Sequence, residues 1–262
     1  MATVGKWGDL APRVISAIAM VAVGGAALWL GGFWFAILAI VVSGGMIWEL
    51  GRMLGAPRPE IMGLLAAGAM AVGHSTSFSL GYLVLAVVPL AGAIVVTRGR
   101  WIFALYGLAL SGAILWLLTT RAEGMAALLW VVLIVVASDI LGYFAGRILG
   151  GPKFWPRVSP KKTWSGTVAG WLGAAAVGLG FAACGFDGPL GGGASVVILS
   201  ALAGFAGQMG DIAESAIKRF AGIKDSSNLI PGHGGLLDRF DALTGAAVFL
   251  FTVEALKNGG AL

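Results

Sequence analysis

The sequence predicts an all-α, polytopic integral membrane protein with about nine transmembrane helices and a cytoplasmic N-terminus. Hydrophobic residues make up 58% of the 262 residues, and only 11% are charged. The mean hydropathy is +0.93. A water-soluble domain with this composition would precipitate, whereas in a bilayer the same apolar surface is solvated by lipid. The positions of the few cations, considered below, indicate the orientation.

Nine apolar segments are candidates for membrane spans, because a spanning helix needs about 20 apolar residues. The first is long and lacks a small-residue cleavage signal, so we expect a retained helix and not a signal peptide. The third is short and weak. Several segments are rich in Gly and Ala, which suits close helix packing in lipid. The segments are 13–30, 33–50, 61–74, 78–96, 101–118, 125–146, 165–185, 194–212 and 241–257.

The distribution of Lys and Arg predicts which loops face the cytoplasm. With the N-terminus inside and nine spans, all 17 Lys and Arg except Arg121 and Lys257 fall on the cytoplasmic side. This asymmetry follows the positive-inside rule. Two polar zones, 147–164 and 211–240, then face the cytoplasm, where soluble nucleotides are found.

Several classes of protein are excluded. A single cysteine, Cys184, rules out a disulfide framework and a multi-cysteine zinc site. Two histidines leave little room for His-rich metal ligation. The net charge of +5 arises from few charges, and no Lys/Arg run is interleaved with aromatics, so we expect no nucleic-acid partner. No polar segment is long enough for a soluble domain.

The most informative segment is 211–241, where nine of 31 residues are charged. Holding so many charges together near a bilayer is costly, so such a cluster is a functional site by default. The charged residues are Asp211, Glu214, Lys218, Arg219, Lys224, Asp225, Asp238, Arg239 and Asp241.

The spacing within this segment suggests chemistry on phosphates. Asp211, Glu214, Ser215 and Lys218 follow i, i+3, i+4, i+7, which places them on one face of a helix. The run 231–235, Pro-Gly-His-Gly-Gly, must turn tightly, and its backbone N–H groups can cradle phosphate. Carboxylates suit Mg²⁺ and basic side chains neutralise phosphate. Two functions fit these features about equally well. One is an enzyme of metal-assisted phosphoryl or nucleotidyl transfer, and the other is an ion-coupled transporter.

The segment Ser215–Asp241 resembles the signature of the phosphatidate cytidylyltransferase (CDP-diacylglycerol synthase) family. The family pattern begins with Ser, any residue, an aliphatic residue, Lys-Arg, four residues and Lys-Asp. It continues with aliphatic-Pro-any-His-Gly-Gly and ends with Asp-Arg-aliphatic-Asp, where this chain has Phe240 at the aliphatic position. The resemblance extends upstream to Asp139, Tyr143, Gly146-Arg147 and the run 159–163, Ser-Pro-Lys-Lys-Thr. We therefore divide the chain into 1–120, which matches only as apolar spans, and 121–262, which carries the predicted site.

The resemblance implies that CTP and phosphatidate give CDP-diacylglycerol and pyrophosphate, in the phospholipid biosynthesis of a bacterial inner membrane. It implies Mg²⁺, with room for a second, monovalent cation such as K⁺. Asp211 and Asp238 are the first candidates for metal ligands, and Asp225 and Asp241 are second ligands or anchors for basic residues. The predicted catalytic residues are Asp211, Asp238, Lys218 and Asp225. The predicted substrate-binding residues are Ser215, Arg219, Lys224, His233, Gly234, Gly235, Arg239, Lys161, Lys162, Thr163, Asp139, Tyr143 and Arg147.

Each assignment has a structural alternative. Asp211 could be a partner of Lys218, and Asp238 could cap the last helix. Asp139, Tyr143 and Arg147 share a helical face that could be a close-packing seam with a buried ion pair. A CTP-dependent polyprenol kinase is an alternative enzyme. A transporter would place its charges near the bilayer midplane, often with inverted repeats, and no repeat is evident. The small-residue spans are compatible with a homodimer.

Overall fold

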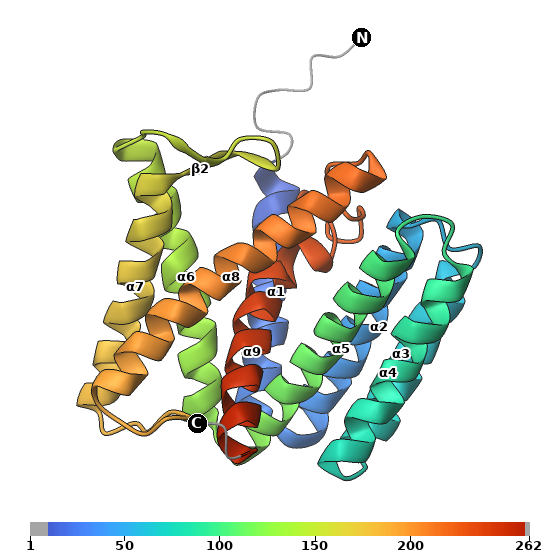
Figure 1. The fold of residues 1–262 in the computed structure, drawn as a ribbon, viewed down its shortest axis with the longest axis horizontal. Helices are drawn as coiled ribbons and strands as arrows, with labels where there is room; N and C mark the ends of the chain where they lie inside the picture. Colours follow the sequence, from blue (N-terminus) through green and yellow to red (C-terminus); the bar gives the residue numbers. More distant parts are fainter. Residues whose placement is uncertain (1–9, 260–262) are drawn as a thin grey trace. The chain divides into compact units, whose positions relative to one another are not determined.

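The computed structural model describes residues 10–259, and within them the chain forms nine α-helices and one small antiparallel sheet (Figure 1). Lys6, counted above among the cytoplasmic cations, lies outside the described residues. The helices are α1 (Leu10–Leu30), α2 (Gly32–Met53), α3 (Pro59–His74), α4 (Phe78–Val95), α5 (Arg100–Glu123), α6 (Met125–Ile148), α7 (Trp164–Ala183), α8 (Ala194–Ala221) and α9 (Leu237–Asn258). The strands are β1 (Lys153–Trp155) and β2 (Ser159–Thr163).

Each predicted span corresponds to one helix, so the all-α prediction is confirmed in its main feature. Within the described residues, six helices are long and apolar enough to cross a membrane, namely α1, α2, α5, α6, α7 and α8. Helix α4 contains a shorter apolar stretch, and α3 and α9 are not among the six. The protein is therefore an all-α membrane protein, and the count of nine spans stays a prediction.

Helix α8 continues nine residues beyond the predicted span, to Ala221, because its last turns are amphipathic and not uniformly apolar. It ends at Gly222, whose φ of 76° is the left-handed conformation that glycine adopts without strain. The helix therefore stops where a glycine permits the left-handed turn.

The β1–β2 hairpin was not predicted. Lys153 pairs with Thr163 and Trp155 with Ser159, with an irregularity between the two pairs. The strands are too short and too rich in Lys and Pro for a period-two hydrophobic pattern, which is the usual signal for a strand. Thr163 ends the hairpin and caps α7, since its hydroxyl accepts a hydrogen bond from the Gly166 N–H at 3.2 Å.

The chain divides into two compact units. Unit 1 comprises 1–111 and 223–239, and unit 2 comprises 112–222 and 240–262, each as far as the structure describes them. Helices α5 and α9 contribute residues to both units. The sequence-based division at residue 120 rests on a different criterion, namely which part of the chain carries the family motifs, and it stays a prediction.

In unit 1, helices α2, α3 and α4 pack in sequence order. Gly44 of α2 and Gly63 of α3 meet so closely that a Cβ on either would lie 2.8 Å from the other's carbonyl oxygen. The α2–α3 and α4–α5 loops lie side by side, because Arg98 N–H donates to Leu54 O at 3.1 Å. One end of the unit therefore carries four arginines: Arg52, Arg58, Arg98 and Arg100.

In unit 2, α6 and α7 pack side by side and α8 crosses them obliquely (Figure 1). Gly142 and Gly146 of α6 face Gly166 of α7, and a Cβ on Gly166 would lie 2.5 Å from Gly142 O. The close-packing seam of α6 is therefore its glycine face. The expectation that the face of Asp139, Tyr143 and Arg147 is a seam with a buried ion pair is wrong, because all three side chains are exposed. Buried Gln208 of α8 ties the three helices together through hydrogen bonds to Ser138 (3.3 Å), Thr167 O (3.2 Å) and Trp171 (3.0 Å).

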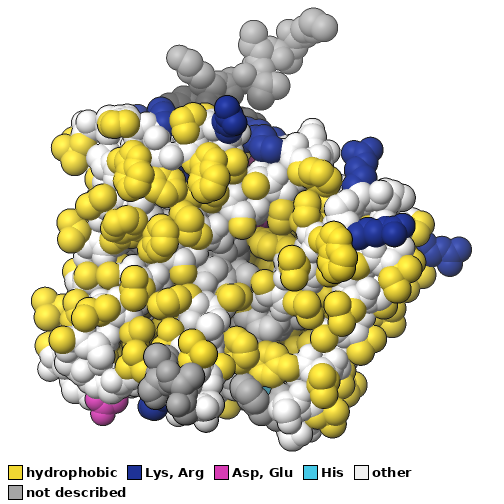
Figure 2. Space-filling model, viewed as in Figure 1, with side chains coloured by type: hydrophobic (Ala, Val, Ile, Leu, Met, Phe, Trp, Pro, Cys, Tyr) yellow, Lys and Arg dark blue, Asp and Glu magenta, His cyan; other side chains and the backbone are white. Residues whose placement is uncertain are grey.

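On the face drawn in Figure 2, hydrophobic side chains cover most of the surface over the helices, and the Lys and Arg side chains lie mainly near its upper edge. Large apolar residues such as Val21, Leu64, Ile94 and Leu172 are more than half exposed. Such a surface is stable only against lipid.

Candidate active site

Helix α8 presents the predicted polar face in unit 2. Ser215 Oγ donates to Asp211 Oδ1 at 3.3 Å, and Lys218 Nζ lies 2.5 Å from Glu214 Oε2. The i, i+4 contacts confirm that these four residues share one face. Glu214 is fully buried and Lys218 is mostly buried, so the charge of this pair is neutralised within the unit.

The ion-pair partner of Asp211 comes from the hairpin. Lys162 Nζ lies 2.6 Å from Asp211 Oδ2 and 3.4 Å from Gln208 O. The structural alternative that paired Asp211 with Lys218 is thus replaced by two pairs, Lys162–Asp211 and Lys218–Glu214. The side chains of Lys162 and Asp211 are 24% and 32% exposed, so a ligand can reach both.

A further carboxylate, Asp241 of α9, belongs to the same unit, and its backbone packs against Gly210 of α8, where a Cβ would collide with Asp241 O. Asp241 Oδ1 also accepts the Ala242 N–H at 2.8 Å. Among the described residues, no group of three or more His, Cys, Asp and Glu side chains is gathered as a metal site. Protein-bound Mg²⁺ commonly uses only one or two carboxylates together with substrate phosphates, so the donor chemistry of Asp211 and Asp241 fits this ion.

Two other predicted substrate contacts have local partners in unit 2. Arg147 donates to Tyr143 OH at 2.7 Å along the exposed face of α6. Thr163 is buried and occupied in capping α7, which gives it a structural role of its own. Lys161 and Arg219 are exposed at this end of the unit.

In unit 1, Asp238 organises the signature loop. Its Oδ2 accepts three hydrogen bonds: from Ser226 N–H (2.9 Å), Ser226 Oγ (2.7 Å) and Gly235 N–H (2.8 Å). All three donors lie upstream of α9, which begins at Leu237, so Asp238 holds the signature loop from the first turn of the helix and does not occupy the N-cap position expected for a capping residue. Because Oδ2 is occupied by these donors, a metal contact would use Oδ1.

Glu49 of α2 was missed in the sequence analysis. Its carboxylate is fully buried and accepts hydrogen bonds from Ser226, Ser227, Leu236 and Leu237. The signal was present, because a carboxylate inside the predicted span 33–50 is costly unless it is paired and is a functional candidate by default. Arg52, one turn later, donates to Ser226 O at 3.0 Å and lies over the Trp48 ring at 5.3 Å.

His233 is held by α1. Ser16 Oγ lies 2.8 Å from His233 Nδ1, 2.9 Å from Pro231 O and 3.0 Å from Arg13 O. Ser16 therefore links the imidazole of His233 and the carbonyl of Pro231 to the first turns of α1. The imidazole is thereby oriented by the turn.

The two predicted phosphate-binding glycines differ. Gly234 has a φ of 84°, which only glycine adopts readily. Gly235 is needed for space, because a Cβ there would collide with Ser226 Oγ and Glu49 Oε1. The N–H of Gly235 already donates to Asp238. Nearby, Lys224, Asp225 and Arg239 are exposed.

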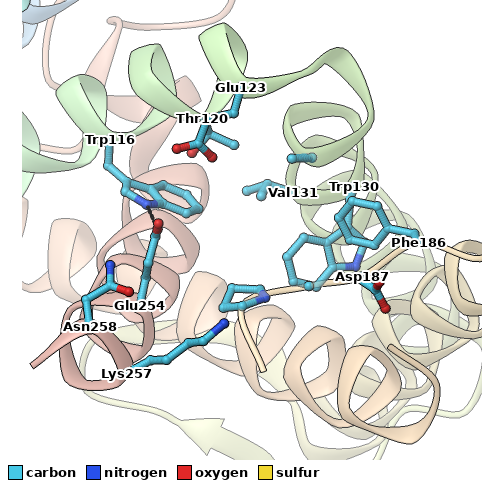
Figure 3. Close-up of a pocket in the computed structure, with 13 residues that line it drawn as sticks. Trp116, Thr120, Glu123, Trp130, Val131, Phe186, Asp187, Glu254, Lys257 and Asn258 are labelled. Atoms are coloured by element: carbon cyan, nitrogen blue, oxygen red, sulfur yellow. Dashed lines mark hydrogen bonds between the residues drawn. The ribbon is translucent and has the colours of Figure 1, made fainter. Parts of the chain in front are cut away.

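A cavity of about 210 Å³ lies at the end of unit 2 away from Asp211 (Figure 3). In it, Trp116 Nε1 donates to Glu254 Oε2 at 2.7 Å, and Glu123 and Lys257 also line it. In unit 1, a groove of about 560 Å³ between α3 and α4 is lined by apolar side chains and Arg58. Neither space includes a residue of the signature.

Comparison with known proteins agrees with these features. A profile of the Cytidylyltransferase family matches residues 11–256, so the chain belongs to this family of membrane nucleotidyltransferases. It is 34% identical over 267 residues to a phosphatidate cytidylyltransferase of Brucella abortus, covering 95% of this chain and 94% of the relative. It is 36% identical over 258 residues to one of Pseudomonas aeruginosa, covering 90% and 94%. A Haemophilus influenzae relative of the same name is 43% identical over 131 residues, covering 48% and 45%.

Proposed function

We propose that this protein is a phosphatidate cytidylyltransferase, which converts CTP and phosphatidate into CDP-diacylglycerol and pyrophosphate. The observation that carries the proposal is the similarity to enzymes of that name over more than nine-tenths of both chains. The unbroken signature Ser215–Asp241 supports it. A polyprenol kinase is disfavoured by the intact signature. A transporter is disfavoured by the position of the signature charges, which lie in the loop 222–236 and in the adjoining turns of α8 and α9.

In the proposed reaction, a phosphate oxygen of phosphatidate attacks the α-phosphorus of CTP. A new P–O bond forms, the bond from the α-phosphorus to the bridging oxygen breaks, and pyrophosphate leaves with the electron pair. The attacking phosphate is already ionised, so no general base is required. The protein must bring two polyanions together, which makes electrostatic stabilisation the main catalytic contribution.

Within unit 2, we assign Asp211 as a metal ligand and Asp241 as a second ligand or anchor. A bound Mg²⁺ would neutralise phosphate charge as the leaving group departs. Lys162 holds Asp211 in place at 2.6 Å, while Lys161, Lys218 and Arg219 are phosphate binders. Ser215 supports Asp211, and Asp139, Tyr143 and Arg147 are assigned to substrate contact.

Within unit 1, Asp238 is assigned as a ligand through Oδ1, and Asp225 as a second ligand or an anchor. The exposed Lys224 and Arg239 are phosphate binders, and His233 and Gly234 are assigned to phosphate contact. A monovalent cation such as K⁺ would be a further occupant.

We further propose nine spans with the N-terminus in the cytoplasm, in a bacterial inner membrane. The support is the loop distribution of Lys and Arg, all of which except Arg121 and Lys257 fall on one side. The site would then face the cytoplasm, where CTP is present. A homodimer is part of this proposal and is supported by the small-residue helices.

The test is pyrophosphate release by purified protein with CTP, dioleoyl phosphatidate and Mg²⁺. Release that requires all three, stops with EDTA and gives CDP-diacylglycerol by mass spectrometry would establish the reaction. If a folded preparation released no pyrophosphate, the acceptor would be wrong, and polyprenols and lipid alcohols would be tried with the same nucleotide.

A further inference from the structure

Glu49 is the fully buried carboxylate in unit 1 that contacts the signature loop from a distant part of the chain. Four donors converge on it: Ser227 Oγ at 2.5 Å and Leu236 N–H at 3.0 Å on Oε1, and Leu237 N–H at 2.7 Å and Ser226 Oγ at 3.2 Å on Oε2. All four are neutral groups. The charge is therefore stabilised by oriented dipoles and not by a cation among these partners.

Two of these donors belong to the start of α9. The first N–H groups of a helix lack intrahelical partners, and they carry the positive end of the helix dipole. Glu49 satisfies these groups from α2, as an anion at a helix N-terminus would. It therefore fixes where α9 begins, and with it the position of Asp238 in the first turn.

Ser226 links Glu49 to Asp238. Its hydroxyl lies 2.7 Å from Asp238 Oδ2 and 3.2 Å from Glu49 Oε2, and one proton serves the two acceptors. The shorter contact takes the proton, so the Glu49 contact is the weaker of the two. Arg52 holds the carbonyl of the same residue. Ser226 is thus held between Glu49, Arg52 and Asp238, and the firm part of the Glu49 contact comes from Ser227, Leu236 and Leu237, whose loss would loosen the loop and the start of α9 on either side of Asp238.

We infer that Glu49 is a positioning residue, which holds the signature loop and the first turn of α9 in the geometry needed for catalysis. It does not touch substrate in this assignment. The expected effect of Glu49 on kcat rests on the proposed function. Its effect on the order of the loop does not, because loop order can be measured without turnover.

The test is Glu49→Gln, with Glu60→Gln as a matched control, because Glu60 is an exposed carboxylate on α3 of the same unit. A glutamine keeps the shape, but its amide N–H₂ faces donors that then lose an acceptor. In hydrogen exchange of the folded protein in detergent, we expect peptides covering 223–239 to exchange about tenfold faster or more in Glu49→Gln. Glu60→Gln should match the wild type.

Kinetics provides the second readout. We expect kcat per folded molecule to fall by about tenfold or more, a larger change than that in KM for phosphatidate, because preorganisation acts on the transition state. Glu49→Asp should recover part of the loss. Wild-type kcat together with wild-type exchange in 223–239 would overturn the inference. A Glu49→Gln protein that is inactive but shows wild-type hydrogen exchange in 223–239 would also overturn the inference, because the loop would then be ordered without the Glu49 carboxylate.

Ser227→Ala keeps the inference testable should Glu49→Gln not fold. It removes one donor to Oε1 and also frees the Leu229 N–H that Ser227 Oγ accepts at 3.0 Å. We expect a smaller rise in exchange across 223–239 and a smaller loss of kcat. Unchanged exchange and kcat in this variant would contradict the inference.

Discussion

At the scale of single residues, the central feature is that predicted catalytic residues, Asp211 and Lys218, are held by partners of opposite charge. Lys162 neutralises Asp211, and Glu214 neutralises Lys218. The Lys162–Asp211 pair is partly exposed, so its net contribution to stability is small, about 0–1 kcal/mol. Breaking this pair costs little, and both side chains are accessible at a charged end of the unit. Lys162 and Asp211 are therefore well suited to release each other and bind a ligand.

We predict that Asp211→Asn loses most activity while the protein still folds. The amide keeps the shape but removes the charge that Mg²⁺ and Lys162 require, and a loss of about 100-fold in kcat, on the order of 3 kcal/mol, is expected. Steady-state pyrophosphate release measures it. The control is Glu123→Gln, at the other end of the unit. Near wild-type turnover of Asp211→Asn at saturating Mg²⁺ would remove Asp211 from the metal assignment.

The two adjacent lysines of the hairpin should differ. Lys161 is exposed, so Lys161→Ala should raise KM for CTP by roughly tenfold, the contribution of one charge-assisted hydrogen bond, with little effect on the lipid dependence. Lys162→Ala should lower kcat as well, because Asp211 loses its partner. Titrations of CTP at saturating lipid, and of lipid at saturating CTP, separate these effects. An unchanged CTP dependence in Lys161→Ala would leave this residue only a topological role.

At the scale of elements, close approach between helices positions the charged residues. The seam between α6 and α7 brings the backbones together at Gly142 and Gly166. Thr163 caps α7 at the same end, so the hairpin that carries Lys162 is anchored directly to the seam. Van der Waals contact between small residues is the main force available to helices in lipid.

Gly166→Ala should therefore destabilise the protein. The new Cβ would lie 2.5 Å from Gly142 O and 3.3 Å from Gly146 Cα, so backbone must move, and overpacking of this kind costs roughly 1–3 kcal/mol. Thermal unfolding in detergent should show a lower transition temperature. Gly180→Ala on the same helix meets open space and should leave it unchanged or slightly higher. Equal transition temperatures for the two variants would contradict the seam.

At the scale of the whole molecule, each unit carries its signature residues together with basic residues at one end, while Arg121 and Lys257 of unit 2 lie at the other end. In unit 1 the loop 223–236 is tied to α2 beside Arg52. In unit 2 the hairpin is tied to α8 at Asp211. This arrangement gives residues 1–111, which lack the signature, a defined task in unit 1, since α1 and α2 hold the loop through Ser16, Glu49 and Arg52.

The proposed orientation predicts a labelling pattern. The single cysteine of the sequence, Cys184, is exposed at the end of α7 opposite Thr163. In intact cells with a permeabilised outer membrane, a membrane-impermeant maleimide should label it. In a Cys184→Ser background, Arg157→Cys on the hairpin should react only after the inner membrane is opened. The reverse pattern would show that the N-terminus is outside.

Much of the fold could be predicted because membrane helices leave a local signal. The nine apolar segments correspond to the nine helices, and the spacing of Asp211, Ser215 and Lys218 placed them correctly on one face of α8. The hairpin 153–163 escaped prediction because its pairing is stabilised by contacts such as that between Phe154 and Trp164, whose ring centroids are 4.7 Å apart. No periodic pattern reports such contacts.

The sequence by itself determined the class of protein, the helices and the signature, because hydropathy and residue spacing act over a few turns of chain. Only the tertiary structure decided the partners: Lys162 for Asp211, Ser16 for His233, and Glu49 for the Leu237 N–H, 188 positions later. The physical reason is that a buried charge is paired with donors that chain packing brings to it, and the sequence around Glu49 does not predict that Leu237 will be one of them. The residues that carry the proposed chemistry were thus visible in the sequence, whereas the residues that hold them in place were not.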